Sequence, residues 1–383
     1  MKKVFKKIKK VLSSTFLIKI LNLITSITPI QKNLIIFESF FGVSISDNPL
    51  AIYENIDRSK YDCLFLVNDP KKYSDFKTVK RQTLKSYFLM RKAKVIINNS
   101  RMPKYWKKRD GQVYIQTWHG TPLKKLVHDL TTFNMPSANS LDDYLKLFDD
   151  DIKKWDYLIS SCPYSTSCFK SAFQFEKEIL EIGYPRNYKL YNYTTLDKES
   201  IKKKLNIPND KRVVLYAPTY RDNQNNGLGE YYFNSKLDFK KLQYEFPDTI
   251  FLIRYHYLIT QTNDIDYENV INVSDYSTIS DLYLISDLLI TDYSSVFFDY
   301  SILKKPFLFF TPDIDEYQDD LRGFYLDMYL DFPNIPAKTN DEVIAQMKEL
   351  NLSNYQDFTK KYNPDKNKDC IVKILNIINE NTF

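Results

Sequence analysis

The strongest indication of the fold comes from residues 286–310, which read SDLLITDYSSVFFDYSILKKPFLFF. An apolar run, Leu288–Thr291, suits a buried strand, and a polar turn with two serines follows it. Apolar residues then recur at helical spacing to about Lys304, and Pro306 opens a second apolar run. A strand, a helix and a strand in this order form a βαβ unit, which builds a parallel sheet with helices on its faces.

The same alternation of short apolar runs and helical patterns extends to both sides of this unit. An earlier series of strand candidates comprises Leu34–Phe37, Cys63–Val67, Val95–Ile97, Val113–Ile115 and Tyr157–Ile159. The later series comprises Val213–Tyr216, Ile250–Arg254, Val270–Val273, Leu288–Thr291 and Phe307–Phe310. A polar, lysine-rich linker, residues 186–211, separates the two series. We therefore expect an α/β protein with two doubly wound domains that face a cleft, where such folds bind ligands.

Charge and composition restrict the class of protein. The 383 residues include 54 Lys+Arg and 48 Asp+Glu, a net charge of +6. Residues 1–32 hold eight lysines and no acidic residue, which leaves 46 basic and 48 acidic residues in the rest. A nearly neutral body argues against a nucleic-acid-binding protein. An apolar content of 43% excludes a disordered chain, and only 7 glycines make a glycine-rich phosphate loop improbable.

Cysteine and histidine are too sparse to suggest a metal site. Four cysteines occur without any C-x-x-C pair, which is typical of buried thiols in a reducing compartment. Only three histidines are present, His119, His128 and His256. General acid–base chemistry near neutral pH therefore has few candidates.

The N-terminal segment, residues 1–32, predicts a basic amphipathic helix that lies on an anionic membrane. Val4, Ile8 and Val11 recur at helical spacing, and so do Phe16 and Ile20. The lysines of the opposite face that we expect at the membrane are Lys2, Lys3, Lys6, Lys7, Lys9 and Lys10. A solvated helix packed on the body, or a cleaved or spanning segment, are the alternatives.

The first motif with chemical potential is Trp118-His119-Gly120-Thr121-Pro122, at the end of an apolar strand. A histidine at a strand's carboxyl end can act as a general base in the cleft. The following glycine lets the backbone approach a ligand closely. The alternative is a histidine that only stabilises a turn.

Arg254 and His256 form the second motif, in FLIRYHYLI. Alternation places both side chains on the same side of an extended chain. Because arginine binds phosphate oxygens through two N–H groups, the pair predicts a phosphate clamp. The alternative is an arginine paired to a carboxylate.

Two further turns follow strands of the second series. Asp292, Ser294 and Ser295 precede a helix, whose free N–H groups and serine hydroxyls can bind an anion; ordinary helix capping is the alternative. Pro218 and Thr219 follow another strand, and a hydroxyl there could contact a nucleotide.

Together these segments resemble the CDP-glycerol glycerophosphotransferase family of teichoic acid synthesis. The matching pieces are FESFFGVSISDNP (37–49), VIINNSRMPKYWKKRDGQVYIQTWHGTPLK (95–124), GYPRN (183–187), LYAPTYRD (215–222), IRYH (253–256) and SDLLITDYSSVFFDYSILKKPFLFFTPD (286–313). The resemblance covers about residues 34–345. Tyr257 departs from the family, which usually has proline after the second motif histidine.

The resemblance implies a GT-B-like fold and a peripheral enzyme of the cytoplasmic membrane face. It implies transfer of glycerol phosphate from CDP-glycerol to a hydroxyl of an undecaprenyl-diphosphate-linked saccharide, or of a growing poly(glycerol phosphate) chain, with release of CMP. His119 and His256 would be the catalytic residues, with His119 as the base. We expect the donor to be bound by Gly120, Thr121, Pro122, Arg186, Pro218, Thr219, Arg254, Asp292, Ser294, Ser295 and Asp299.

The expected organisation is a membrane-associating segment (1–32), an acceptor-side Rossmann-like domain (33–190), a donor-binding Rossmann-like domain (191–350) and a helical tail (351–383). The length favours a primase of wall teichoic acid or capsule assembly; a polymerase or a CDP-ribitol-using enzyme stays open. From other classes, a nucleotide-sugar glycosyltransferase and an inactive membrane scaffold remain alternatives. No metal site or cofactor is expected, although assistance by Mg²⁺ stays open, as does the oligomeric state.

Overall fold

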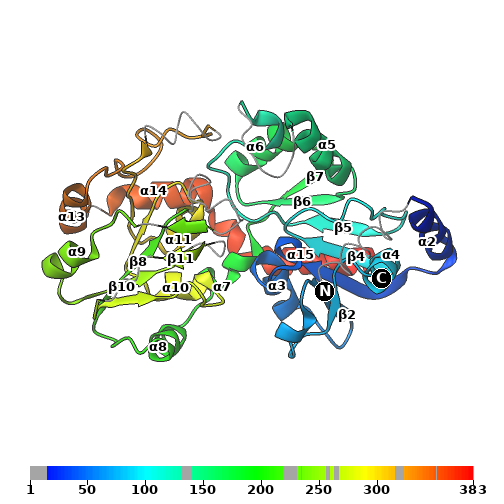
Figure 1. Cartoon of the computed structure of the whole chain (residues 1–383), viewed down its shortest axis with the longest axis horizontal. Coiled ribbons are helices and arrows are strands. Elements are labelled where there is room, and N and C mark those ends of the chain that lie inside the picture. Colours follow the sequence, from blue (N-terminus) through cyan, green and yellow to red (C-terminus); the bar gives the residue numbers. More distant parts are fainter. Residues whose placement is uncertain are drawn as a thin grey trace.

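The protein consists of two α/β domains that lie side by side (Figure 1). The computed structural model describes residues 15–131, 140–219, 231–233, 235–255, 259–262, 267–314, 323–350 and 352–382. In Figure 1 the N-terminal domain is on the right and the C-terminal domain on the left. Two short helical segments, η4 (Pro185–Asn187) and α7 (Tyr188–Tyr191), connect them.

The N-terminal domain is built on a seven-stranded parallel sheet. Its strands are β1 (Gln31–Glu38), β2 (Asp62–Val67), β3 (Thr78–Lys80), β4 (Ala93–Asn98), β5 (Val113–Gln116), β6 (Tyr157–Ser160) and β7 (Glu178–Glu181). Their order in space is β3-β2-β1-β4-β5-β6-β7. In the central register, Ile35 of β1 pairs with Cys63 and Val95. The order reverses between β1 and β4, which is where doubly wound folds open a ligand crevice.

Helices cover both faces of this sheet, because successive residues of its strands point to opposite sides. Ile35 and Phe37 pack into one buried cluster, while Leu34 and Ile36 pack into another. The helices are α3 (Asp47–Asn55), α4 (Leu84–Lys92), α5 (Leu141–Ile152) and α6 (Pro163–Phe173). Apolar runs in the sequence therefore correspond to strands that are buried on both faces.

The C-terminal domain repeats this design on five parallel strands. They are β8 (Arg212–Ala217), β10 (Thr249–Ile253), β12 (Val270–Asn272), β13 (Leu288–Thr291) and β14 (Phe307–Phe309), in the order β12-β10-β8-β13-β14. A separate two-stranded sheet pairs β9 (Tyr231–Phe233) with β11 (Ile259–Thr262). The helices are α8 (Thr195–Lys204), α9 (Phe239–Glu245), α10 (Ile279–Ile285), α11 (Val296–Tyr300) and α13 (Asn340–Lys348).

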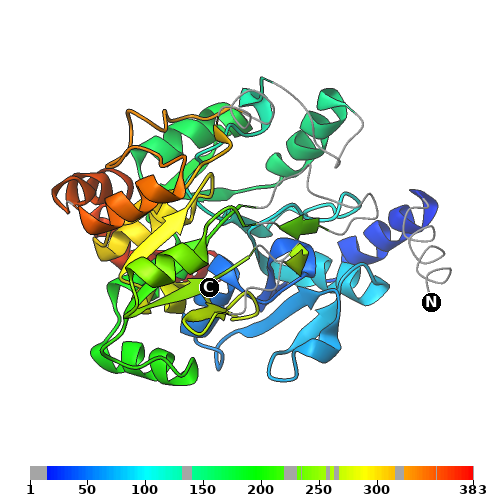
Figure 2. The same ribbon diagram turned by 60° about the vertical axis from the view of Figure 1, so that its left-hand side comes forward.

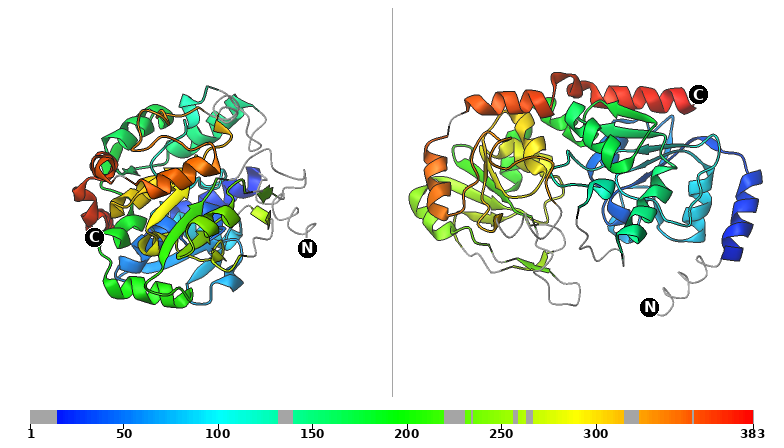
Figure 3. Two further views of the ribbon diagram at one scale, coloured as in Figure 1. Left: turned by 90° about the vertical axis from the view of Figure 1, so that its left-hand side faces the viewer. Right: turned by 90° about the horizontal axis from the view of Figure 1, so that it is seen from above.

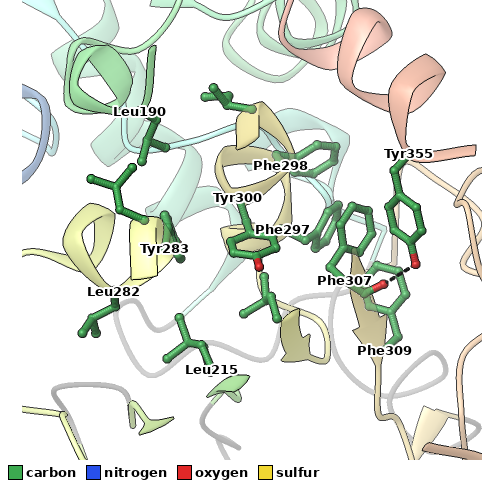
Figure 4. Packing of buried hydrophobic residues seen from close by; sticks show 14 of the residues in the cluster. Leu190, Leu215, Leu282, Tyr283, Phe297, Phe298, Tyr300, Phe307, Phe309 and Tyr355 are labelled. Atoms are coloured by element: carbon green, nitrogen blue, oxygen red, sulfur yellow. Dashed lines mark hydrogen bonds between the residues drawn. The ribbon is translucent and has the colours of Figure 1, made fainter. Parts of the chain in front are cut away.

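An aromatic cluster fills one side of this second sheet (Figure 4). Phe307 of β14 is fully buried, and its ring lies 5.4 Å from that of Phe297 and 5.0 Å from that of Tyr355. The Tyr355 hydroxyl donates a 2.8 Å hydrogen bond to the Phe307 carbonyl. This packing fixes α11, and hence the turn before it, against the sheet.

The last two helices connect the domains a second time. The first, α14 (Ser353–Tyr362), packs on the C-terminal domain, and α15 (Cys370–Thr382) returns to the N-terminal domain (Figure 3, right). Cys370, Ile374 and Ile378 of α15 are buried in the same cluster as Ile35. The segment expected as a helical tail is thus helical, and its two helices belong to different domains.

Most predicted elements are confirmed. All ten strand candidates are strands whose ends agree within three residues, and the helix after Ser295 forms as α11 followed by a 3₁₀ turn, η5 (Ser301–Leu303). The sequence analysis missed β3, β7, β9 and β11, which have three or four residues each. Runs this short carry too few apolar side chains for a pattern to emerge.

At the N-terminus, the described chain begins with α2 (Thr15–Ile27), which lies at the outer edge of the N-terminal domain (Figures 1 and 2). Leu23 and Ile27 are 69% and 81% exposed, whereas Thr25 on the other side is buried and accepts a hydrogen bond from Arg91. The lysines predicted at the membrane, Lys2–Lys10, lie outside the described residues. Within the described part of the chain, no helix has the length and apolar character needed to cross a membrane.

We expect the substitution Phe307→Ala to lower the free energy of unfolding by about 3–5 kcal/mol, because it leaves a cavity among the rings of Figure 4. Urea unfolding measures the change. The control Tyr244→Ala, at a side chain that is 83% exposed, should change the free energy by less than about 0.5 kcal/mol. Equal effects of the two substitutions would contradict this account of the core.

Candidate active site

A histidine loop after β5 forms one wall of the candidate site. Trp118 and Gly120 have φ angles of +52° and +139°, so the backbone on both sides of His119 is in a region that side chains disfavour. The buried Asn48 side chain donates a 3.0 Å hydrogen bond to the Trp118 carbonyl. The Trp118 ring stacks on the imidazole, with 4.4 Å between the ring centres. The loop is therefore held in one strained conformation that presents His119.

The hydrogen bond of His119 indicates which of its nitrogens can accept a proton. Nδ1 lies 2.8 Å from the carbonyl oxygen of Asn99, so Nδ1 carries the hydrogen and donates it. Nε2 is left with its lone pair. His119 is exposed to the pocket, yet partial removal of its ring from water lowers its pKa, while the Asn99 contact and the Asp47 charge oppose that decrease. The neutral, base-competent form is therefore favoured near pH 7.

The residues after His119 approach the C-terminal domain closely. A Cβ atom at Gly120 would lie 3.0 Å from Nη2 of Arg186 and 3.3 Å from Oγ of Ser295. Thr121 is buried, with its hydroxyl 3.0 Å from that of Ser161, and the Pro122 carbonyl accepts a hydrogen bond from Tyr164. Gly120 therefore permits the two domains to meet at this loop, whereas the close approach to a ligand that its position in the motif predicted stays a prediction.

Arg254 follows β10 and lies in the wall contributed by the C-terminal domain. Its Nη1 donates hydrogen bonds to the carbonyls of Tyr276, at 2.5 Å, and Val273, at 3.3 Å. Burial lowers the pKa of Arg254, and charges on Tyr283 and Asp275 oppose that decrease. Among the described residues no carboxylate is within ion-pair distance of this guanidinium. The predicted alternative, an arginine paired to a carboxylate, is thus not seen in the described part of the chain.

Two adjacent strand ends complete the C-terminal wall. The Asp292 carboxylate, buried after β13, accepts a 2.8 Å hydrogen bond from the N–H of Thr219, after β8. Ser294 and Ser295 follow and lead into α11, and the Ser295 side chain forms no capping hydrogen bond. Asp292 thereby ties together the two loops that hold Pro218, Thr219 and the serines.

A pocket of about 370 Å³ lies between these walls. The predicted residues that line it are His119, Gly120, Thr121, Pro122, Pro218, Thr219, Arg254, Ser294 and Ser295. Tyr255 and Tyr293, which the sequence analysis did not single out, line it as well. Residues from four separate segments of the chain are thus brought together, at the carboxyl ends of strands in both domains.

Three predicted donor-binding residues lie behind this pocket. Asp292 supports the loops described above. Arg186 and Asp299 form a buried ion pair of 2.5 Å, and Arg186 also pairs with Asp47 at 2.6 Å. The described residues that line the pocket include none of the three. Their role in binding the donor remains a prediction, and their geometry is that of supporting residues.

Sequence reasoning missed Asn99, whose carbonyl oxygen contacts His119, and Asp47, which contacts Asn99 and Arg186. Both lie in segments that carry the family resemblance, and each follows a strand whose carboxyl end faces the cleft, β1 and β4. Their position after these two strands was the sequence signal that could have identified both residues. His256 lies outside the described residues, so its predicted role is not tested by the geometry. Within the described part, no group of three His, Cys, Asp or Glu side chains could hold a metal ion.

Comparison with known proteins gives consistent matches over nearly the whole chain. A family model described as CDP-Glycerol:Poly(glycerophosphate) glycerophosphotransferase matches residues 20–380. The teichoic acid poly(glycerol phosphate) polymerase of Bacillus subtilis (strain 168) is 41% identical over 384 residues, 97% of this chain and 51% of that protein. The chain thus spans about half the length of this relative. The teichoic acid glycerol-phosphate transferase of Staphylococcus aureus (strain NCTC 8325 / PS 47) is 41% identical over 331 residues, 84% of each chain.

A more distant relative and a solved structure also match the chain. The teichoic acid glycerol-phosphate primase of Bacillus subtilis (strain 168) is 30% identical over 304 residues, 77% of this chain and 76% of that protein. The structure of the wall teichoic acid polymerase TagF matches with a TM-score of 0.88 and 36% identity, covering 100% of this chain and 97% of that chain. The predicted GT-B-like fold is thereby confirmed.

We expect His119 to titrate below its ordinary pKa of 6.5, which NMR of ¹⁵N-histidine-labelled protein measures, with His119→Gln assigning the signal. Because the pKa is lowered in the folded state, the unfolded chain binds the proton more readily below pH 6.5. The contribution of His119 to stability is therefore complete above pH 6.5 and is lost as the pH falls through the lowered pKa. A pKa above 6.5 would contradict the assigned environment.

Proposed function

The chain belongs to the CDP-glycerol:poly(glycerophosphate) glycerophosphotransferase family, and on this premise we propose that it transfers glycerol phosphate from CDP-glycerol to a hydroxyl of a lipid-linked acceptor. One observation carries the proposal. His119 lines a pocket from the N-terminal domain, and Arg254, Ser294 and Ser295 line the same pocket from the C-terminal domain. A base and an anion-binding wall are the two parts that phosphoryl transfer to a hydroxyl requires.

In the proposed reaction the acceptor oxygen forms a bond with the β-phosphorus of CDP-glycerol. The bond from that phosphorus to the bridging oxygen breaks, and its electron pair leaves with CMP. The hydroxyl proton passes to Nε2 of His119, which the Nδ1–H contact to Asn99 leaves free to accept it. Proton removal raises the nucleophilicity of the attacking oxygen at the moment of attack.

The wall contributed by the C-terminal domain stabilises the negative charge of the pyrophosphate in this proposal. Only Nη1 of Arg254 has hydrogen bonds within the described chain, so its remaining N–H groups can donate to phosphate oxygens. The hydroxyls of Ser294 and Ser295 are additional donors. The resemblance adds His256 as a second catalytic residue; because it lies outside the described residues, this role rests on the resemblance.

Within this activity we propose chain extension with glycerol phosphate rather than priming. The relatives at 41% identity carry the names of a polymerase and a glycerol-phosphate transferase, whereas the primase is 30% identical. The primase expectation from chain length has no comparable support. The acceptor we propose is accordingly a lipid-linked chain that already ends in glycerol phosphate.

We also propose peripheral attachment to the cytoplasmic face of the cell membrane, where the acceptor's lipid is anchored. The exposed apolar side chains of α2, Leu23, Ile24 and Ile27, support this proposal. The basic residues of the preceding segment would add electrostatic attraction to anionic lipids.

The function is tested by CMP release from CDP-glycerol, CDP-ribitol and UDP-glucose with an acceptor that carries one or several glycerol phosphate units. We expect CMP from CDP-glycerol, fastest with the longer acceptor, and a loss of about 10²–10⁴-fold in kcat for His119→Ala. Arg254→Met should impair turnover, with His128→Ala as the control, because His128 pairs with Asp149 and is not among the described residues that line the pocket. Absence of CMP release from any CDP-alditol would refute the proposal. Assays with Mg²⁺ or EDTA determine whether a metal ion assists.

Membrane attachment is tested by co-sedimentation with vesicles of phosphatidylglycerol and phosphatidylcholine. We expect the double variant Leu23→Glu/Ile27→Glu to bind at least about tenfold more weakly, because each glutamate replaces an apolar contact with the lipid. Binding of the wild type should fall with rising salt. Leu330→Glu, at an 83% exposed residue of the C-terminal domain, is the matched control. Unchanged binding of the double variant would refute α2 as the attachment.

A further inference from the structure

A continuous chain of buried polar contacts runs behind the histidine wall of the pocket. It links α3, the turn after β4, η4 and α11, and so involves both domains. Its members are Asp47, Asn99, Arg186, Asn187 and Asp299. We infer that Asp47, Asn99 and Arg186 are positioning residues for His119, and that Asp299 extends their network to the donor-binding domain. This inference rests on the proposed function, because it assigns His119 the role of base.

Arg186 is the centre of the network. Nη1 donates to the Asp47 carboxylate at 2.6 Å and to the carbonyl oxygen of His119 itself at 2.8 Å. Nη2 donates to Asp299 at 2.5 Å. One planar guanidinium therefore fixes the main chain of the base relative to a carboxylate on each domain.

Asn99 holds the imidazole from the other side. Its carbonyl oxygen accepts the Nδ1–H of His119 at 2.8 Å. Its side chain donates to Asp47 at 3.1 Å and accepts from the N–H of Phe40 at 2.9 Å. Asp47 thus links Asn99, which orients the ring, to Arg186, which fixes the main chain. His119 is therefore held at two points.

Three observations favour positioning over substrate binding for Arg186. Its side chain is 13% exposed, and its partners Asp47 and Asp299 are 10% and 5% exposed. It is not among the described residues that line the pocket. Gly120 leaves room for Nη2, because a Cβ there would lie 3.0 Å from that atom. Nη1 and Nη2 are consequently occupied by protein acceptors on the far side of the pocket wall.

The network also sets the charge around the imidazole. The charged groups around His119 are Asp47 on α3, Arg186 on η4 and, across the pocket, Arg254 after β10, with Lys124 on its own loop. The charge of Asp47 raises the pKa of His119 and that of Arg186 lowers it. Neutralising Asp47 should therefore lower the pKa of His119, and neutralising Arg186 should raise it. A purely structural contact would not produce shifts of opposite sign.

Three variants test the inference through kcat, the donor KM and the acid limb of the pH profile of kcat/KM. We expect Asp47→Asn, Arg186→Met and Arg186→Lys to lower kcat by about 10–100-fold and to change the donor KM by less than about threefold. The acid limb should move to lower pH in Asp47→Asn and to higher pH in Arg186→Met. The acid limb should stay in place in Arg186→Lys, because lysine keeps the positive charge but lacks the planar set of N–H donors of a guanidinium.

Lys366→Met is the matched control, since it breaks a 2.7 Å ion pair with Glu181 that lies outside the pocket. It should leave kcat and the acid limb unchanged. Unchanged kcat in both Asp47→Asn and Arg186→Lys, or acid limbs that do not follow the sign of the removed charge, would overturn the inference. If Arg186→Met fails to fold, the two conservative variants carry the test.

NMR titration of His119 in the same variants separates this inference from the proposed function. The pKa of the imidazole should shift down in Asp47→Asn whether or not the protein turns over CDP-glycerol. An inactive wild type with these pKa shifts would refute the proposed function while retaining the network. An active wild type without the shifts would refute the network alone.

Discussion

The Arg186 guanidinium is buried where the two domains meet, and two carboxylates from different domains hold it there. Burial alone would lower the pKa of Arg186, but the charges of Asp299 and Asp47 raise it, so the group stays charged. Removing one partner of such a buried pair typically costs about 3–5 kcal/mol, because the remaining charge loses its compensation. The same guanidinium, which contacts both domains, also donates a hydrogen bond to the main chain of His119. The relative placement of the domains and the geometry of the pocket therefore depend on the same ions.

The surroundings of His119 and Arg254 give the two walls of the pocket different charge states. His119 is partly removed from water and donates Nδ1–H to a carbonyl, so its other nitrogen is kept as a base. Arg254 contacts two carbonyls, and no described carboxylate neutralises it. A neutral base on one wall, and on the other a cation with no carboxylate within ion-pair distance among the described residues, suit a reaction in which a hydroxyl attacks a diphosphate.

Contacts with neighbouring residues hold the histidine loop in its strained backbone conformation. Trp118 occupies a left-handed conformation, and Asn48 holds its carbonyl. Neighbouring contacts of this kind allow an unfavourable backbone to persist. The aromatic cluster around Phe307 supports the opposite wall, because it anchors α11 and the serines that precede it. Asn48 and Phe307, which support the two walls, are themselves not among the described residues that line the pocket.

The two parallel sheets could be predicted from the amino-acid sequence, because strands buried on both faces appear as short apolar runs such as Val213–Tyr216. The sequence also indicated His119, Arg254 and the serines, since functional residues of this fold follow strand ends. Only the tertiary structure decided that Arg186 and Asp299 lie behind the pocket, that Asp47 and Asn99 hold the histidine, and that α15 returns to the first domain. Those assignments depend on contacts between residues from 20 to more than 300 positions apart, and no local periodicity encodes such distances.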